Sequence, residues 1–526
     1  MNAKIFHGVP FYTMDSERSV KRAVVVVNGK IKYITENPNE AHNLYPDAEL
    51  IEFSEGCIIP GFVDAHLRLK EYSILFKDLD LSKVMYKSDV IDKIQEIVPE
   101  KEDGEWLLSG GLEKSFINQL TKDDLDAVSQ NNPIILFSWD MGSAIVNSNA
   151  LQCAGIDESR QDPLGGKIER DVYNKPNGIL HERAVELVRK AIPEDKTKVV
   201  DSAIEKGIKK ILSNGVTTIC DCSTKLGSES IKNLMKLLRH NKLKARIVVM
   251  VQEGDARRLG EIGFSSFFGN DYLRLGGFSI MIDGSLASLT GYMSTPYKGG
   301  SSNGMLLMDE DELYILLKNH YSHYFWAAVQ CTGDRANEIA LEVFKKISTE
   351  RGIPRLLKRI EYALTLKDED VERFAEIDVT PVMMPGQIPS DRKYAIKHLG
   401  SEAKLVYRFR SLAASGATIA FASNAPSSTV NPFYGLYCAV ERKAFNDGPE
   451  MRFYPRESLT IADAVYAYTM GGAKACGLEN EIGSIEVGKF ADLVHLSADI
   501  FSQDSESLIK TEVMTVFIGG EAVFKK

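Results

Sequence analysis

The sequence predicts an α/β protein whose main part is a distorted (β/α)8 barrel, or TIM barrel. Two further parts are expected: a small β-sandwich formed by the N- and C-terminal strands, and an inserted α/β subdomain. Two observations lead to this prediction. Helices alternate with apolar strands from about residue 200 onward, and glycine-separated strands lie at both ends of the chain. We expect residues 1–58 and 480–526 to form the sandwich, and residues 59–479 the barrel, with the insertion at about 70–200.

Strand signals at the two ends of the chain indicate a composite β-domain. Residues 23–27 form an apolar run, the Asn28-Gly29 pair is a hairpin turn, and residues 31–34 form the next strand. At the other end, residues 483–496 and 513–524 alternate apolar and polar side chains around turn glycines. Neither set is large enough to enclose a core alone, so we expect the two sets to pair with each other.

The middle of the chain gives the insertion and the barrel. Residues 90–98 have the apolar period of a helix and residues 133–137 form an apolar strand, which is typical of a mixed α/β subdomain. Residues 198–213 form an amphipathic helix, and several short apolar runs follow it. These strand candidates are residues 215–219, 246–251, 277–282, 325–330 and 418–422. Such alternation implies parallel strands joined by helical crossovers.

Composition excludes several classes of partner. The 526 residues carry a formal net charge of −10 and no long basic run, so nucleic acid and anionic membranes are not expected partners. No stretch of about 18 apolar residues is present, and the N-terminus lacks the apolar segment of a signal peptide. The seven cysteines are scattered and odd in number, which favours free thiols and a cytoplasmic location. Cys220 and Cys222 are interpreted as buried structural thiols.

One short stretch marks where the barrel begins. Residues 60–68 are Pro-Gly-Phe-Val-Asp-Ala-His-Leu-Arg, which places His66 and Arg68 two positions apart. Further motifs follow in order over nearly the whole chain. They are residues 106–111, 147–151, 165–171, 177–182, 283–286, 333–336, 359–361, 431–432 and 483–494. In these motifs the chain resembles the amidohydrolase superfamily, and within it the amidohydrolase-3 (YtcJ-like) branch.

The resemblance implies metal-assisted hydrolysis, usually of C–N bonds in small molecules such as amides and formamides. In that family, histidines and carboxylates hold divalent ions, which lower the pKa of a bound water. The chain keeps the first-strand histidine, His66, and departs from the pattern at the other positions. The residues found there are Arg68 for the second histidine, Ser279 for a lysine, Gln330 and Tyr362 for the histidines of the fifth and sixth strands, Asn424 for the eighth-strand aspartate, and Gly142 for a histidine of the subdomain.

These replacements predict that the metal site is lost. One histidine cannot hold a divalent ion, which needs three or more protein ligands, so we expect no metal and no other cofactor. Asn424 has no titratable group that could act as a general base. His66 is interpreted either as a structural residue, which we favour, or as a hydrogen-bond partner of a substrate.

Several residues remain as candidates for a site at the barrel mouth. The catalytic candidates are His66, Arg68, Cys331, Tyr362 and Asn424, and the pocket candidates are Glu182, Ser279, Asp283 and Gln330. Arg68 is permanently charged, so we expect it to replace the charge of the metal. It would do so in an ion pair with an acid such as Asp283 or Glu182, or by binding an anionic ligand. Cys331 could act as a nucleophile only if a base or a positive charge lay nearby.

Three functions are compatible with this pattern. The favoured one is a small-molecule-binding protein or pseudoenzyme of the family. The second is a hydrolase of non-peptide carbon–nitrogen bonds with a metal-independent or rebuilt site. The third is a non-hydrolytic reaction in the reused pocket, such as an isomerisation or elimination aided by Arg68 and Tyr362. The expected partner is a small molecule, and the sequence does not distinguish a monomer from a homo-oligomer.

Overall fold

A computed structural model describes residues 3–74, 78–81, 84, 86–112, 114–138, 143–163, 166–193, 197–223 and 228–526. The chain divides into two compact units. The first contains residues 1–67, 209–423 and 430–526, and the second contains residues 68–208 and 424–429. The chain therefore enters the second unit directly after the first barrel strand and returns to the first unit within helix α8 (Thr197–Leu212).

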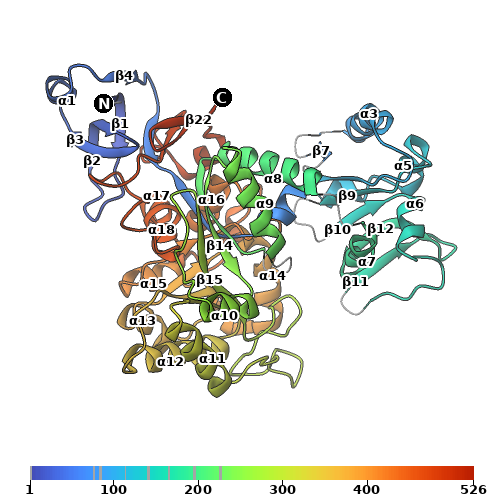
Figure 1. Ribbon diagram of the computed structural model, residues 1–526. Coiled ribbons are helices and arrows are strands. Elements are labelled where there is room, and N and C mark those ends of the chain that lie inside the picture. Colours follow the sequence, from blue (N-terminus) through green and yellow to red (C-terminus); the bar gives the residue numbers. More distant parts are fainter. Residues whose placement is uncertain are drawn as a thin grey trace. The chain divides into compact units, whose positions relative to one another are not determined.

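Eight parallel strands form the barrel sheet of the first unit, in the order β19-β18-β17-β16-β15-β14-β13-β6. Two of them, β14 and β15, are labelled side by side in Figure 1. Their bounds are β6 (Phe62–Leu67), β13 (Val216–Asp221), β14 (Arg246–Val251), β15 (Leu273–Met281), β16 (Ala327–Cys331), β17 (Lys358–Tyr362), β18 (Thr380–Met383) and β19 (Ala420–Phe421). The predicted α/β class with a distorted TIM barrel is confirmed.

A buried carboxylate bridges the two edge strands of this sheet. Asp64 in β6 accepts the backbone N–H of Ser423, which follows β19, at 3.0 Å. The same oxygen accepts the backbone N–H of His66 at 3.2 Å. Burial raises the pKa of Asp64 to about 6. The side chain of Asp64 thus spans the opening that the strand ladder leaves near the C-terminal ends of the strands.

Helices of the first unit follow the strands, as expected for helical crossovers. Their bounds are α1 (Pro38–Leu44), α9 (Ser228–Arg239), α10 (Glu253–Glu261), α11 (Glu310–Ser322), α12 (Asp334–Thr349), α13 (Asp368–Glu376), α14 (Ile388–Leu399), α15 (Phe409–Ala414), α16 (Pro432–Glu441), α17 (Ile461–Tyr466) and α18 (Gly472–Ala475). Helix α11 is a clear case of local sequence control. Asp309 and Glu312 form its capping box, and Leu313, Leu317 and Tyr321 recur at helical spacing as its buried face.

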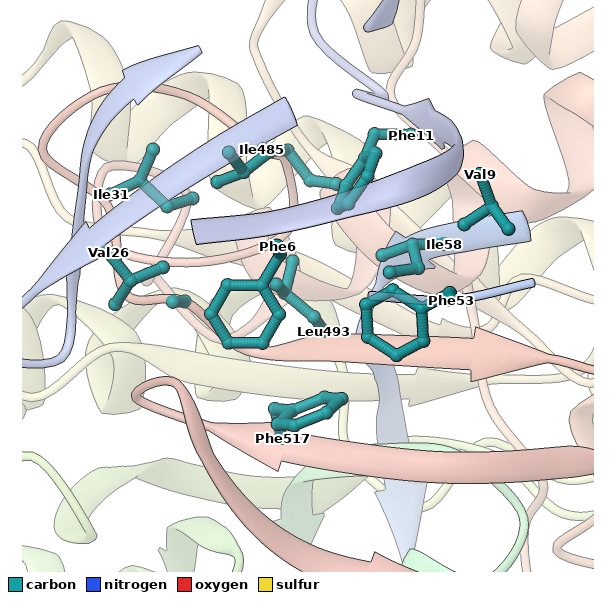
Figure 2. Packing of buried hydrophobic residues seen from close by; sticks show 12 residues of the cluster. Phe6, Val9, Phe11, Val26, Ile31, Phe53, Ile58, Ile485, Leu493 and Phe517 are labelled. Carbon is teal, nitrogen blue, oxygen red and sulfur yellow. The ribbon is translucent and has the colours of Figure 1, made fainter. Parts of the chain in front are cut away.

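Strands from both ends of the chain share one eight-stranded sheet, in the order β22-β21-β20-β5-β1-β2-β3, with β4 paired to β1. Their bounds are β1 (Ala3–Tyr12), β2 (Val20–Val27), β3 (Lys30–Thr35), β4 (Glu49–Glu52), β5 (Cys57–Pro60), β20 (Leu493–Leu496), β21 (Val513–Ile518) and β22 (Glu521–Lys525). Figure 2 shows their shared core, in which N-terminal Phe6 lies near C-terminal Leu493 and Phe517. The rings of Phe6 and Phe517 meet edge to face with centroids 5.1 Å apart.

The second unit has a six-stranded mixed sheet, in the order β11-β12-β10-β9-β8-β7. Its strands are β7 (Leu79–Asp80), β8 (Leu107–Leu112), β9 (Ile134–Ser138), β10 (Ser143–Val146), β11 (Gly166–Arg170) and β12 (Pro176–Glu182). Its helices are α2 (Leu69–Ile74), α3 (Lys87–Ile97), α4 (Lys114–Ile117), α5 (Lys122–Val128), α6 (Ser148–Cys153) and α7 (Arg183–Ala191). The helix predicted at residues 90–98 and the strand predicted at residues 133–137 are confirmed by α3 and β9. Among the residues that the structure describes, every helix is too short or too polar to span a lipid bilayer.

Candidate functional site

Polar side chains gather at the C-terminal ends of the barrel strands, around the buried carboxylate of Glu361 in β17. We call this group the Glu361 cluster. Its members are His66 of β6, Cys222 directly after β13, Ser279 of β15, Gln330 of β16, and Arg359 and Glu361 of β17. In barrels of this class the C-terminal ends of the strands carry the functional site.

Strand geometry explains why these side chains meet. Arg359 and Glu361 are two positions apart on β17, so both side chains lie on the same face of the strand. The parallel ladder between β16 and β17 pairs Gln330 with Glu361. A glutamine and a glutamate at the same level of neighbouring strands are within hydrogen-bonding reach.

One oxygen of Glu361 is shared by three neighbours. Arg359 Nη2 donates to Glu361 Oε1 in a short, fully buried ion pair. His66 Nδ1 lies 3.0 Å from the same oxygen, which is ion-pair distance, although the angle is not that of a hydrogen bond. Cys222 Sγ is 3.9 Å from it.

The second oxygen of Glu361 is held by neutral groups. Gln330 Nε2 donates to Glu361 Oε2 at 3.0 Å, and Ser279 Oγ donates to it at 3.2 Å. Gln330 Nε2 also donates to Ser279 Oγ at 2.8 Å. Both oxygens of the carboxylate are therefore engaged by protein groups.

Arg359 supplies the positive charge of the cluster. Burial alone raises the pKa of the Glu361 carboxyl, but the charges of His66 and Arg359 outweigh it and hold the pKa well below its usual range. The guanidinium of Arg359 also donates to the backbone oxygens of Ala65, at 2.8 Å, and Ala475, at 3.0 Å. These bonds fix a permanent cation next to the carboxylate.

Arg68 and Asn424 belong to the second unit. Arg68 Nη2 donates to Ser427 Oγ at 2.8 Å, and its backbone N–H donates to the oxygen of Ala425 at 2.8 Å. Asn424 is buried and has a φ of +57°. The side chain of Glu182 and the whole of Gly142 lie outside the described part of the structure.

Asp283, one of the pocket candidates, orders the segments around it. Its carboxylate accepts the backbone N–H groups of Tyr292 at 2.8 Å, Thr332 at 2.9 Å and Gly333 at 2.8 Å. Burial nevertheless raises its pKa to about 6. Backbone amides therefore occupy the carboxylate that the sequence suggested as a partner for Arg68.

Cys331 and Tyr362 lie at the ends of neighbouring strands, β16 and β17. Cys331 is fully buried, and burial, together with the charges of Asp283 and Glu361, raises the pKa of its thiol well above its usual range. The thiol is therefore protonated near neutral pH and is a poor nucleophile. Tyr362 has a φ of +68°, which is unusual for an aromatic residue, and its ring lies 5.9 Å from that of His66.

The structure thus brings His66, Ser279 and Gln330 together around two residues that sequence reasoning missed, Arg359 and Glu361. The sequence contains a pattern that indicates Arg359 and Glu361. An arginine and a glutamate separated by one isoleucine in a buried strand place two charges on one face, where they must pair. Cys222 had no comparable signal, because its spacing from other ligand types is not that of a metal motif.

Comparison with known proteins identifies the family. A model described as the amidohydrolase family matches residues 50–524. The chain belongs to the amidohydrolase family. A Bacillus subtilis (strain 168) protein named putative amidohydrolase YtcJ is 30% identical over 99% of both chains. An N-substituted formamide deformylase from Arthrobacter pascens is 26% identical and covers 97% of this chain and 96% of its own. The predicted resemblance to the YtcJ-like branch is confirmed.

Solved structures of two hydrolases share the fold. An uncharacterized metal-dependent hydrolase from Pyrococcus furiosus is 24% identical, with a TM-score of 0.74 over 95% of this chain and 100% of that one. One from Pyrococcus horikoshii OT3 has the same identity and TM-score over 96% and 99% of the two chains.

The amidohydrolase chemistry raises the question of whether the Glu361 cluster suits a metal ion. Within the described residues, His66, Cys222 and Glu361 form a group whose ligand atoms all lie within 4.8 Å of one another. Three donors would be enough for zinc. However, Glu361 Oε1 already faces the guanidinium of Arg359, and burial raises the pKa of the Cys222 thiol well above its usual range. A divalent ion at these three donors would have to share Glu361 Oε1 with the guanidinium and displace the proton of the Cys222 thiol.

Proposed function

We propose that this amidohydrolase-family protein has no catalytic divalent metal and binds a small molecule at the C-terminal end of its barrel without metal-dependent hydrolysis. The observation that supports this most strongly is the engagement of both Glu361 oxygens by Arg359, Gln330 and Ser279. A metal bound at Glu361 would have to share a carboxylate oxygen with the guanidinium of Arg359. Two cations bound to one oxygen repel each other.

The residues at the implied ligand positions support the same proposal. Gln330 and Ser279 take part in the hydrogen bonds to Glu361, so neither amide nor hydroxyl is free to act as a metal ligand without leaving the carboxylate. The free thiols of all seven cysteines fit a reducing compartment, and we place the protein in the cytoplasm on that basis.

The proposal is tested by a paired hydrolysis and binding screen. Panels of amides, N-substituted formamides and lactones are incubated with the protein, with and without added Zn²⁺, Mn²⁺ or Fe²⁺. The formamide deformylase of Arthrobacter pascens serves as the positive control for the formamides. We expect no turnover, together with a rise in melting temperature for at least one class of compound. Metal-stimulated turnover that is lost in Glu361→Gln would contradict the proposal.

A second candidate function is favoured by one observation, the proximity of His66, Cys222 and Glu361. It is a hydrolase of non-peptide C–N bonds with a rebuilt site in which Cys222 takes part. Cys331 offers a matched control, because both thiols are buried and both have a raised pKa. If this candidate is correct, Cys222→Ser abolishes turnover of a substrate found in the screen and Cys331→Ser does not. Equal activity of the two variants would exclude it.

A further inference from the structure

A second concave surface lies outside the Glu361 cluster, on the helical layer of the first unit. This groove has a volume of about 450 Å³, which is within the range of small-molecule sites. It is formed by α11, the start of α10 and the segment that precedes α11. Its lining residues are Glu253, Leu307, Met308, Glu312, Ile315, Leu316, Asn319 and His320.

Half of the residues that line the groove are apolar: Leu307, Met308, Ile315 and Leu316. Glu312, Ile315, Leu316 and Asn319 follow one another at helical spacing on the outer side of α11. Ile315 is 66% exposed, and Leu307 beside it is 51% exposed. Aliphatic side chains gathered in a concave, solvent-facing site are typical of surfaces that bind apolar groups.

The segment before α11 is held in place by backbone bonds, so this apolar surface is preformed. Leu307 N–H donates to the oxygen of Ile282 at 2.8 Å, and Asp283 pairs with Leu306 in an antiparallel bridge.

A carboxylate is fixed at one wall of the groove. His320 Nε2 lies 2.9 Å from Glu253 Oε1, and the His320 ring packs on Phe278 with centroids 4.2 Å apart. Burial lowers the pKa of His320, so the ring is neutral near pH 7 and does not cancel the charge of Glu253. Glu312 adds a second carboxylate, and the described lining residues include no lysine or arginine.

We propose that this groove is a binding site for a small organic cation with an apolar body, such as a primary alkylammonium or arylalkylammonium. The aliphatic side chains of Leu307, Ile315 and Leu316 would cover the apolar body, and the carboxylates of Glu253 and Glu312 would face the ammonium group. None of these residues belongs to the Glu361 cluster, so this site is independent of the proposed function at the barrel mouth.

The test compares three probes of equal length that differ in charge: hexylammonium, 1-hexanol and hexanoate. Binding is followed through the methyl resonances of Ile315 and Leu307 in the full chain. We expect saturable shifts, with affinity decreasing from hexylammonium to hexanol to hexanoate. Glu253→Gln and Glu312→Gln should each weaken hexylammonium binding about threefold or more and leave hexanol unchanged.

Glu310→Gln is the matched control. It removes the same charge from the first turn of α11, but Glu310 pairs with Lys346 and does not line the groove. It should leave all three affinities unchanged. Equal binding of hexanoate and hexylammonium, or no saturable shift with any probe, would overturn the proposal. Shifts at Ile315 that depend on protein concentration alone would also overturn it, because a second copy of the chain would then occupy the groove.

Discussion

Arginine–carboxylate pairs lie at both ends of the barrel, but the pairs are arranged differently. At the N-terminal end, Arg246, the first residue of β14, donates twice to Asp492, at 2.6 and 2.9 Å. Arg274, near the start of β15, donates twice to Glu481, at 2.6 and 2.8 Å. Each arginine thus holds one carboxylate that lies more than 200 residues away in the sequence, as the separations of 246 and 207 residues indicate.

At the C-terminal end, Arg359 and Glu361 lie on the same strand and tie no distant segments together by their mutual bond. Instead, their shared carboxylate gathers neighbours from other strands, among them His66, Gln330 and Ser279. Ion pairs therefore have two different roles in this barrel. At the N-terminal end of the barrel, bidentate ion pairs attach residues near the C-terminus of the chain to the barrel strands. At the C-terminal end of the barrel, one carboxylate with several partners forms the centre of a polar site.

The largest expected effect is at the N-terminal end. Arg246→Met breaks a buried two-point pair and leaves Asp492 with the backbone N–H of Gly519 as a remaining partner. We expect a loss of about 3–5 kcal/mol in the free energy of unfolding and no change in ligand binding at the barrel mouth. Arg274→Met, at a more exposed pair, should cost less. Urea denaturation measures the unfolding free energy of both variants. Equal losses would contradict the expectation that the more buried ion pair contributes more stability.

Glu361→Gln should affect stability less and binding more. The glutamine oxygen still accepts from Arg359, but a fully buried cation loses its counter-charge, so we expect a loss of about 2–4 kcal/mol. Binding of any ligand found in the hydrolysis and binding screen should be abolished. Glu338→Gln, which breaks a half-exposed pair with Arg335 and Lys367, is the control and should have little effect on either quantity. Unchanged ligand binding in Glu361→Gln would contradict the role given to the cluster.

Gln330→Leu is a finer test of the same cluster. It keeps the volume of the side chain but leaves Glu361 Oε2 with Ser279 as its partner in the cluster. A loss of about 1–2 kcal/mol is expected, because one hydrogen bond to a buried charge is removed. Thermal or chemical denaturation gives the value, and a stabilised variant would mean that Gln330 does not support the carboxylate.

Individual carboxylates should also respond to pH in opposite directions, according to whether folding raises or lowers their pKa. Burial raises the folded-state pKa of Asp64 and of Asp283 from 3.8 to about 6. Each therefore contributes its full stability below about pH 4 and loses it as the pH rises through about 6, by about 3 kcal/mol. The pKa of Glu481 is lowered, first by its hydrogen bond to Arg274, so its contribution is present above 4.5 and is lost as the pH falls.

Unfolding free energies measured between pH 4 and 7 check these signs. Asp283→Asn should flatten the decrease toward neutral pH, and Glu481→Gln should leave that decrease intact. A pH slope that is identical in the wild-type protein and Asp283→Asn would show that Asp283 is already ionised throughout the range.

The sequence predicted the barrel because its alternation of helices and apolar strands and its ordered motifs do not depend on details of packing. It also named Ser279 and Gln330 as pocket candidates, because they stand at ligand positions of the family motifs that the chain resembles. It did not predict that Arg359 and Glu361 form the centre. Strand alternation places the two on a common face, but it does not say which face of a strand points into a barrel. Nor does periodicity predict that residues 424–429 group with the second unit, since that depends on contacts between distant segments such as Arg68 and Ser427.

The central claim is that Arg359, Gln330 and Ser279 take the place of a metal at Glu361. The most direct measurement is the metal content of the protein, by elemental analysis, after purification from medium supplemented with zinc, manganese and iron. Glu361→Gln and Cys222→Ser are analysed in parallel. The account predicts no stoichiometric metal in any of the three proteins. One equivalent of metal per chain in the wild-type protein that is lost in either variant would contradict it.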